Sequence, residues 1–136
     1  MHYKIGKMLF KEAKDIREKV FVEEQHFENE FDDIDSWAIH LVVYDKEAIG
    51  CARMYDDNGV MILGRIAVLK EKRALHAGSY ILSVLEKHAR ELGYHEVVLS
   101  AQLQAKPFYA KNGYISYGDV YYDEHTPHIH MKKEIK

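Results

Sequence analysis

The chain has 136 residues, 47% of them hydrophobic, and its 19 Lys plus Arg against 22 Asp plus Glu give a formal charge of -3. This length fits a single domain with a sizeable core (residues 1–136) and is too short for two ordinary domains. The charge argues against a nucleic-acid-binding protein, which would carry a basic stripe. The lone Cys51 excludes an intramolecular disulfide, and no apolar run approaches the roughly 18 residues of a membrane span. We therefore expect a cytoplasmic domain with no membrane partner.

Hydropathy and turn residues predict a mixed α/β order of β-α-β-β-β-α-β-α-β-β. Apolar Ile16, Val20 and Phe21 recur at helical spacing among charged residues, which is typical of an amphipathic helix. Asn58-Gly59 supplies the positive φ angles of a tight hairpin turn, and Gly93 marks the end of a longer helix. The predicted helices cover 11–24, 79–92 and 106–112, and the predicted strands cover 2–5, 38–44, 48–55, 60–68, 97–100, 115–122 and 128–132.

An acidic segment follows the first predicted helix. Between Glu23 and Asp35 the chain has seven acidic residues and no Lys or Arg, with Phe27 and Phe31 scattered among them. This segment reads as a loop or a broken helix. Its negative charge favours a cationic partner or substrate over an anionic one.

The strand ending Arg65-Ile66-Ala67-Val68, the basic loop after it and the helix opened by Ala77-Gly78 form a candidate anion site. Backbone N–H groups at a helix N-terminus are unpaired, and the helix dipole adds positive potential there. Such a site binds phosphate, and Lys72 and Arg73 add positive charge. Gly64, inside the strand, predicts a bulge or a close backbone approach.

Two motifs now carry a resemblance to a known family. Arg73-Ala74-Leu75-His76-Ala77-Gly78 resembles the acetyl-CoA loop of the GNAT superfamily of N-acetyltransferases, which reads Gln/Arg-x-x-Gly-x-Gly/Ala. Gln102, Ala105 and the run from Phe108 to Tyr114 resemble the second signature of that family. The opening run Phe21-Val22-Glu23-Glu24-Gln25 and the later Pro127-His128 are similar to a small stand-alone bacterial branch. The resemblance implies a GNAT fold, with a mixed, mostly antiparallel sheet flanked by helices.

The loop departs from the family pattern at one glycine, which is His76 here. Glycine at that place lets the backbone approach a pyrophosphate and tolerates a positive φ. His76 either crowds the diphosphate or donates a hydrogen bond to it.

The resemblance also implies where acetyl-CoA binds, with no metal ion. The co-substrate would lie in a V-shaped gap between strands 60–68 and 97–100. Backbone groups of the first strand would pair with its pantetheine arm, and amides of the loop would hold its pyrophosphate. The residues implied to bind it are Ile66, Ala67, Val68, Arg73, Ala74, Leu75, His76, Ala77, Gly78, Ser79, Gln102 and Phe108.

Acetyl transfer to an amine needs a proton acceptor, a polarised thioester carbonyl and a proton donor for the leaving thiolate. Tyr109 stands at the general-acid position of the family, and a strand N–H, such as that of Ile66, would polarise the carbonyl. A Lys-like amine has a pKa of about 10.4, so a base must take its proton. Glu24 and His128 are the first candidates, and Glu23, His40 and Glu124 stay open.

The resulting hypothesis is an acetyl-CoA-dependent N-acetyltransferase acting on a primary amine of a cationic small molecule, by direct attack in a ternary complex. Cys51 reads as a small buried residue, not a nucleophile. His125, His128 and His130 lack the carboxylates or cysteines of a recognisable metal site. The alternatives are a catalytically silent acyl-CoA-binding module, motivated by His76, and a homodimer-forming interaction protein that uses its sheet edge.

Overall fold

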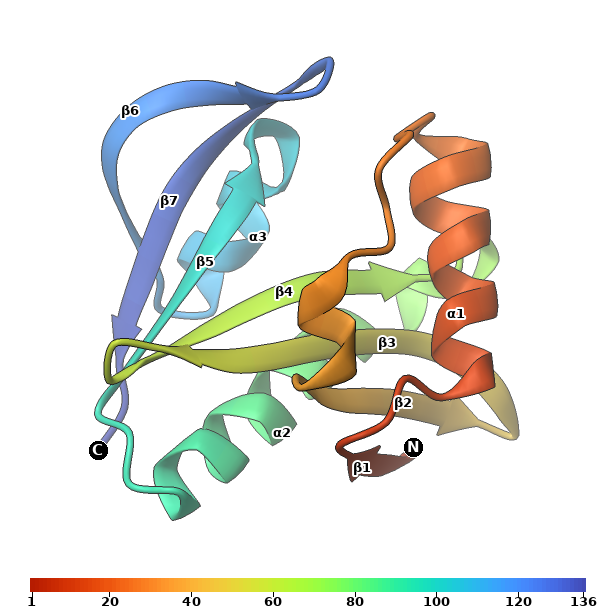
Figure 1. Cartoon of the computed structure of the whole chain (residues 1–136), viewed down its shortest axis with the longest axis horizontal. Coiled ribbons are helices and arrows are strands. Elements are labelled where there is room, and N and C mark those ends of the chain that lie inside the picture. The colour runs from red at the N-terminus through yellow and green to blue at the C-terminus, as the bar shows by residue number, and fades with distance from the viewer.

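The computed structural model describes all 136 residues, and they form a seven-stranded sheet with helices on both faces (Figure 1). The strands lie in the order β1-β2-β3-β4-β5-β7-β6. Only β4 and β5 run parallel, and every other neighbouring pair is antiparallel. The prediction of a mixed, mostly antiparallel sheet is therefore confirmed.

The order of elements along the chain also matches the prediction. The strands are β1 (His2–Gly6), β2 (Ile39–Asp45), β3 (Glu47–Asp57), β4 (Val60–Val68), β5 (Glu96–Gln102), β6 (Ile115–Asp123) and β7 (Thr126–Glu134). The α-helices are α1 (Lys11–Arg17), α2 (Ala77–Glu91) and α3 (Lys106–Lys111). Four further turns of helix are the π-helix η1 (Glu18–Glu24) and the 3₁₀ helices η2 (Asp33–Ser36), η3 (Lys70–Leu75) and η4 (Leu103–Ala105).

Alternate residues of the central strands supply two cores, one on each face of the sheet. Leu41 and Val43 of β2 join a large cluster with α2, whereas Val42 between them joins a smaller cluster with α1. This is the period-two alternation of a strand that is buried on both faces. Figure 1 shows α1 in front of β2, β3 and β4, and α3 behind β5. No helix is long and apolar enough to cross a membrane.

The first helix covers the predicted residues, but its second half is not an α-helix. Residues 11–24 are helical throughout, but the turn widens to a π-helix after Arg17. The wide turn continues past its end, where the N–H of Gln25 donates to the carbonyl of Val20 at 3.1 Å. Hydrophobic spacing does not separate 3.6 residues per turn from a slightly wider turn, so the sequence could not show this change. π-Helical turns are rare in proteins, and those that do occur are often found at functional sites.

Candidate functional site

The parallel strands β4 and β5 pair over only three residues and then separate. Their pairing ends at Leu63 and Leu99. Beyond that point β4 stays with β3 as far as Val68, while β5 stays with β7 as far as Gln102. Ile66, Ala67 and Val68, which are predicted to bind the acetyl donor, therefore lie on an edge of β4 that has no strand partner on the β5 side.

The bulge predicted at Gly64 lies one residue later. In the pairing of β3 with β4, Cys51 faces Ala67 and Arg53 faces Gly64, so β4 holds an extra residue between these pairs. Arg65 takes the left-handed conformation, with φ 48°, whereas Gly64 does not. Ion pairs of the Arg65 side chain with Glu30 (3.0 Å) and Asp32 (3.3 Å) hold this unfavourable backbone in place.

The loop before α2 keeps the backbone shape that glycine would give. His76 has φ 60° and ψ 23° and stands between η3 and α2. Helix α2 begins at Ala77, two residues before the predicted start at Ser79, so Ala77, Gly78 and Ser79 form its first turn. The N–H groups of a first helical turn have no partner within the helix and suit an anion.

Packing against Phe108 leaves no room for a side chain at Gly78. A Cβ atom built on Gly78 would lie 2.8 Å from Cζ of Phe108, closer than real Cβ contacts allow. The ring of Phe108 therefore lies directly against the backbone of α2, and the start of α2 and helix α3 meet at the gap. Two predicted donor residues, Gly78 and Phe108, are thus in mutual contact.

Arg73, predicted to bind phosphate, and Glu24, predicted as a base, are partners of each other. Both terminal nitrogens of Arg73 donate to the Glu24 carboxylate at 2.8 Å, and Nε donates to the carbonyl of Val68 at 3.0 Å. The hydrogen bond from Arg73 lowers the pKa of Glu24 below its ordinary value. A carboxylate with a lowered pKa is a weaker base than a free one.

Tyr109, the predicted general acid, lies on α3 with its side chain almost completely buried. Its ring packs edge-on against those of Phe108 and Tyr114, with centroids 5.1 and 6.0 Å away. Burial raises the pKa of Tyr109 to about 12, so the hydroxyl keeps its proton at neutral pH. The hydroxyl of the neighbouring Tyr114 donates to Glu86 at 2.8 Å, and this side chain is part of the core.

His128 faces Gln102 across the end of β5, and its side chain is 6% exposed. Its Nδ1 lies 2.9 Å from the carbonyl oxygen of Thr126. Because a carbonyl only accepts, Nδ1 carries the proton, and neutral His128 has its lone pair on Nε2. The rings of Phe27 and Tyr121 flank the imidazole at 6.4 and 5.9 Å. This tautomer leaves Nε2 able to accept a proton.

Gln25 joins three parts of the fold at this end of the gap. Its side-chain oxygen accepts from Gln102 of β5 at 2.7 Å, and its backbone carbonyl accepts from His125 at 2.7 Å. Next to it, the carboxylate of Glu124 accepts from the amides of Glu28 and Asn29 at 2.8 and 3.1 Å. The tip of the β6–β7 hairpin is thereby tied to the segment after η1.

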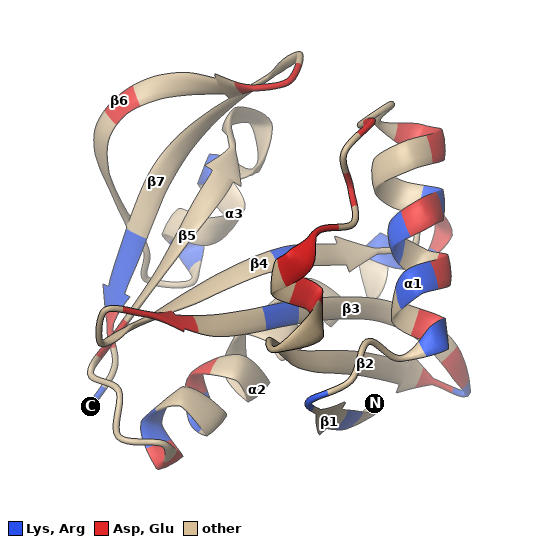
Figure 2. Ribbon diagram, in the orientation of Figure 1, with Lys and Arg blue, Asp and Glu red and all other residues tan.

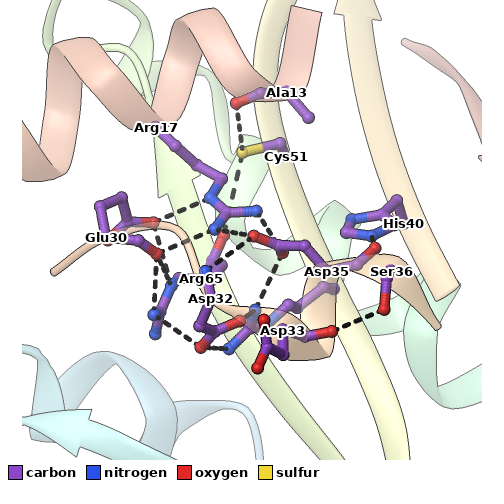
Figure 3. A network of polar contacts seen from close by, with 11 residues as sticks. Ala13, Arg17, Glu30, Asp32, Asp33, Asp35, Ser36, His40, Cys51 and Arg65 are labelled. Atoms are coloured by element: carbon purple, nitrogen blue, oxygen red, sulfur yellow. Dashed lines mark hydrogen bonds and ion pairs between the residues drawn. The ribbon is translucent and has the colours of Figure 1, made fainter. Parts of the chain in front are cut away.

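The acidic segment is largely neutralised by arginines that lie far from it in the sequence (Figures 2 and 3). Arg17 contacts Glu30 and Asp35 at 2.8 Å each, and Arg53 contacts Asp35 at 2.9 Å. With the Arg65 and Arg73 pairs, four of the seven acidic residues have a basic partner: Glu24, Glu30, Asp32 and Asp35. The negative field expected from the sequence is therefore much smaller than the count of carboxylates indicates.

Burial and ion pairing act in opposite directions on these carboxylates. Burial raises the pKa of Glu30 even though Arg65 and Arg17 oppose that shift. For Asp35, hydrogen bonds from Arg17 and Arg53 outweigh burial and lower the pKa to about 2. Two other candidates are enclosed: His40 contacts the carbonyl of Asp35 at 2.9 Å, and burial raises the pKa of the Cys51 thiol to about 12. Cys51 is 1% exposed, which confirms it as a small buried residue.

Sequence reasoning missed Arg65, Gln25 and Glu30. Gln25 and Arg65 each stood within a quoted run of residues, but neither was given a role. The contacts of Arg65 and Glu30 join positions 35 residues apart, and no local pattern signals them. A surface hollow of about 680 Å³ lies elsewhere, between the loop after β1 and η2, with Lys7, Lys14 and Phe31 in its wall.

Comparisons with known proteins agree with this geometry. The family model of the acetyltransferase (GNAT) domain matches residues 4–135. The uncharacterised N-acetyltransferase YjcF of Bacillus subtilis (strain 168) is 40% identical over 128 residues, which is 91% of each chain. A Lactobacillus plantarum protein classed as an N-acetyltransferase matches the whole of both chains with a TM-score of 0.88 and 26% identity. An aminoglycoside 6'-N-acetyltransferase complexed with coenzyme A shares the fold, with a TM-score of 0.78 at 16% identity, over 100% of this chain and 98% of that one.

Proposed function

Because this chain belongs to the GNAT acetyltransferase family, we propose that it transfers an acetyl group from acetyl-CoA to a primary amine of a small molecule. The observation that carries the proposal is the separation of β4 from β5, with the first turn of α2 beside it. An extended donor arm would pair with the free edge of β4, and its phosphates would meet the unpaired amides of α2.

The donor residues proposed from the sequence fit this arrangement. Ile66, Ala67 and Val68 border the gap, and Gln102 ends β5 on its other side. The loop from Ala74 to Ser79 turns into α2 through the left-handed His76. A backbone that already has the shape of the glycine version supports a loop that can bind the diphosphate of the donor. Turnover is the property that separates the enzyme from the silent acyl-CoA-binding module.

Direct attack is the mechanism that we propose. Nε2 of His128 takes a proton from the ammonium group of the acceptor, and the freed lone pair of the nitrogen attacks the thioester carbonyl carbon. A strand N–H, such as that of Ile66, donates to the carbonyl oxygen as it becomes an oxyanion. When the C–S bond breaks, the Tyr109 hydroxyl gives its proton to the thiolate, and the tyrosinate takes up the second proton, which the acetylated nitrogen releases. Cys51 is enclosed and protonated, so it offers no acyl-enzyme route.

Of the two first candidates for the base, we propose His128. The support is the hydrogen bond from Nδ1 to Thr126, which leaves the lone pair on Nε2. In the donor-free protein Arg73 engages both carboxylate oxygens of Glu24, so the choice of His128 rests on its own hydrogen bond.

The test is a thiol-release assay over a panel of amines, with calorimetric titration of acetyl-CoA beside it. Tyr109→Phe should lower kcat by about 10²-fold or more and leave the Kd for acetyl-CoA unchanged. Tyr122→Phe, which changes a tyrosine that is 70% exposed, is the matched control and should keep full activity. Absence of acetyl-CoA binding by the unaltered protein would overturn the proposal. Binding without release of thiol from any amine would favour the silent module.

A further inference from the structure

Arg73 has no free edge with which to meet an anion. Its two terminal nitrogens form a two-point contact with Glu24, and its Nε is held by the carbonyl of Val68. The planar guanidinium matches a carboxylate and a phosphate in the same way. A phosphate group that met the two terminal nitrogens in the same two-point way would therefore take the place of Glu24.

Glu24 and its partner belong to segments on opposite sides of the gap, so such an exchange would affect both segments. It is the last residue of η1, and the next residue, Gln25, is bonded to Gln102 at the end of β5. Arg73 lies in η3, at the start of the turn into α2. The Glu24–Arg73 pair thus links two segments. One is the segment after η1, whose Phe27 packs against His128, and the other is the loop that precedes α2.

We propose that Glu24 competes internally with the donor's diphosphate for Arg73, and that the exchange frees the Glu24 carboxylate to bind a cationic acceptor. This inference rests on the proposed function, because it requires a donor that carries a diphosphate. It makes Glu24 an acceptor-binding residue that is available only after the donor is bound.

The balance of charges favours the exchange. The side chains of Arg73 and Glu24 are 41% and 30% exposed, and exposed ion pairs contribute little to stability. A diphosphate carries more charge than one carboxylate and would also meet the amides and the positive end of α2. The interaction of Arg73 with a diphosphate would therefore be more favourable than its ion pair with Glu24.

Two other carboxylates, those of Glu30 and Glu124, are held by partners that the donor does not require. Glu30 is held by Arg17 and Arg65, and Glu124 by two backbone amides. Glu24 alone among these three has a partner that is also a predicted donor ligand. The acceptor class that fits a freed Glu24 is an amine that bears a second positive charge, such as a linear diamine.

Calorimetric titration with CoA and with pantetheine, which has no diphosphate, tests the competition. Glu24→Gln should lower the Kd for CoA about two- to fivefold, the range expected for loss of an exposed pair. It should leave the Kd for pantetheine unchanged. Glu71→Gln is the matched control, since it removes the same charge from η3, where Glu71 has no ion-pair partner. It should change neither Kd.

Kinetics with a linear diamine and with a monoamine of equal chain length, which lacks the second positive charge, test the proposed role of Glu24 in acceptor binding. Glu24→Gln should raise the KM for the diamine several-fold and leave the KM for the monoamine unchanged. Equal CoA affinity in Glu24→Gln and the unaltered protein would overturn the inference, as would an equal gain in Glu71→Gln. If the unaltered protein does not bind CoA at all, the proposed function itself is overturned.

Discussion

The Nε and Nη2 atoms of Arg65 donate to the backbone carbonyl of Glu30, at 3.2 and 2.9 Å. Arg65 forms the bulge of β4, and Glu30 lies in the acidic segment between η1 and η2. One residue thereby sets the backbone of the strand that borders the gap and fixes the segment beside it. The shape of the donor edge and the position of the acceptor-side loop are therefore coupled through a single side chain.

Arg17 is the most enclosed member of this network, and its loss should be costly. The side chain is 1% exposed and bonds to Glu30 and Asp35. Arg17→Met keeps the apolar stem but leaves two buried carboxylates short of a partner, so the free energy of unfolding should fall by about 3–5 kcal/mol. Lys14→Met, on the exposed side of α1, should cost less than about 0.5 kcal/mol. Urea denaturation measures both, and a loss below about 1 kcal/mol for Arg17→Met would contradict the prediction.

Acid should weaken the protein through Asp35. Its pKa is about 2 in the folded protein against an ordinary value of 3.8, so its carboxylate stabilises the fold above pH 3.8. That contribution is lost as the pH falls through about 2. Burial of Glu30 acts in the opposite direction, because a raised pKa favours the fold as the carboxyl takes up a proton.

Denaturation of Asp35→Asn beside the unaltered protein isolates the contribution of Asp35. The variant should be less stable at neutral pH and lose less stability between about pH 4 and 2. Parallel pH curves for the two proteins would show that Asp35 does not carry this acid sensitivity.

His76 keeps a left-handed backbone at a cost that glycine would not have. A residue with a Cβ loses roughly 1–2 kcal/mol in this conformation, and glycine recovers it at an entropic cost of about 0.5–1 kcal/mol. His76→Gly should therefore gain about 0.5–1 kcal/mol, a rise of a few degrees in Tm. Ala74→Gly, in the same loop but without a positive φ, should lower Tm instead. A lower Tm in His76→Gly would show that its imidazole makes a stabilising contact.

A side chain at residue 78 should destabilise the protein as long as the Phe108 ring stays in its present position. Gly78→Ala brings a Cβ to 2.8 Å from the ring, and such crowding costs about 1–3 kcal/mol unless α3 shifts. We expect weaker binding of acetyl-CoA, because both residues border its proposed site. The double variant with Phe108→Leu removes the clash and should recover most of the lost stability. Thermal denaturation and calorimetry report the two effects, and equal losses in the single and double variants would contradict this account.

The order of the elements and the hairpin at Asn58-Gly59 could be read from the sequence, since hydrophobic period and turn residues are local signals. Tyr109 and His128 were selected through the resemblance, and their catalytic roles stay predictions. The ion network could not, because Arg17, Arg53 and Arg65 come from three different elements and meet the acidic segment only in the folded chain. The bulge was misplaced by one residue because glycine usually takes such a backbone, and here Arg65 takes it while its side chain is held by carboxylates.

The three residue pairs between β4 and β5 have a mechanical consequence. The single sheet has two parts, β1 to β4 and β5-β7-β6, which are joined only by this short pairing at one end of an open wedge. A donor lying in that wedge would act as an eighth strand, so its binding energy would also be folding energy. At a concentration of about 100 times Kd, this linkage would add about 2.7 kcal/mol of stability. Donor supply would then govern the lifetime of the protein as well as its rate of turnover.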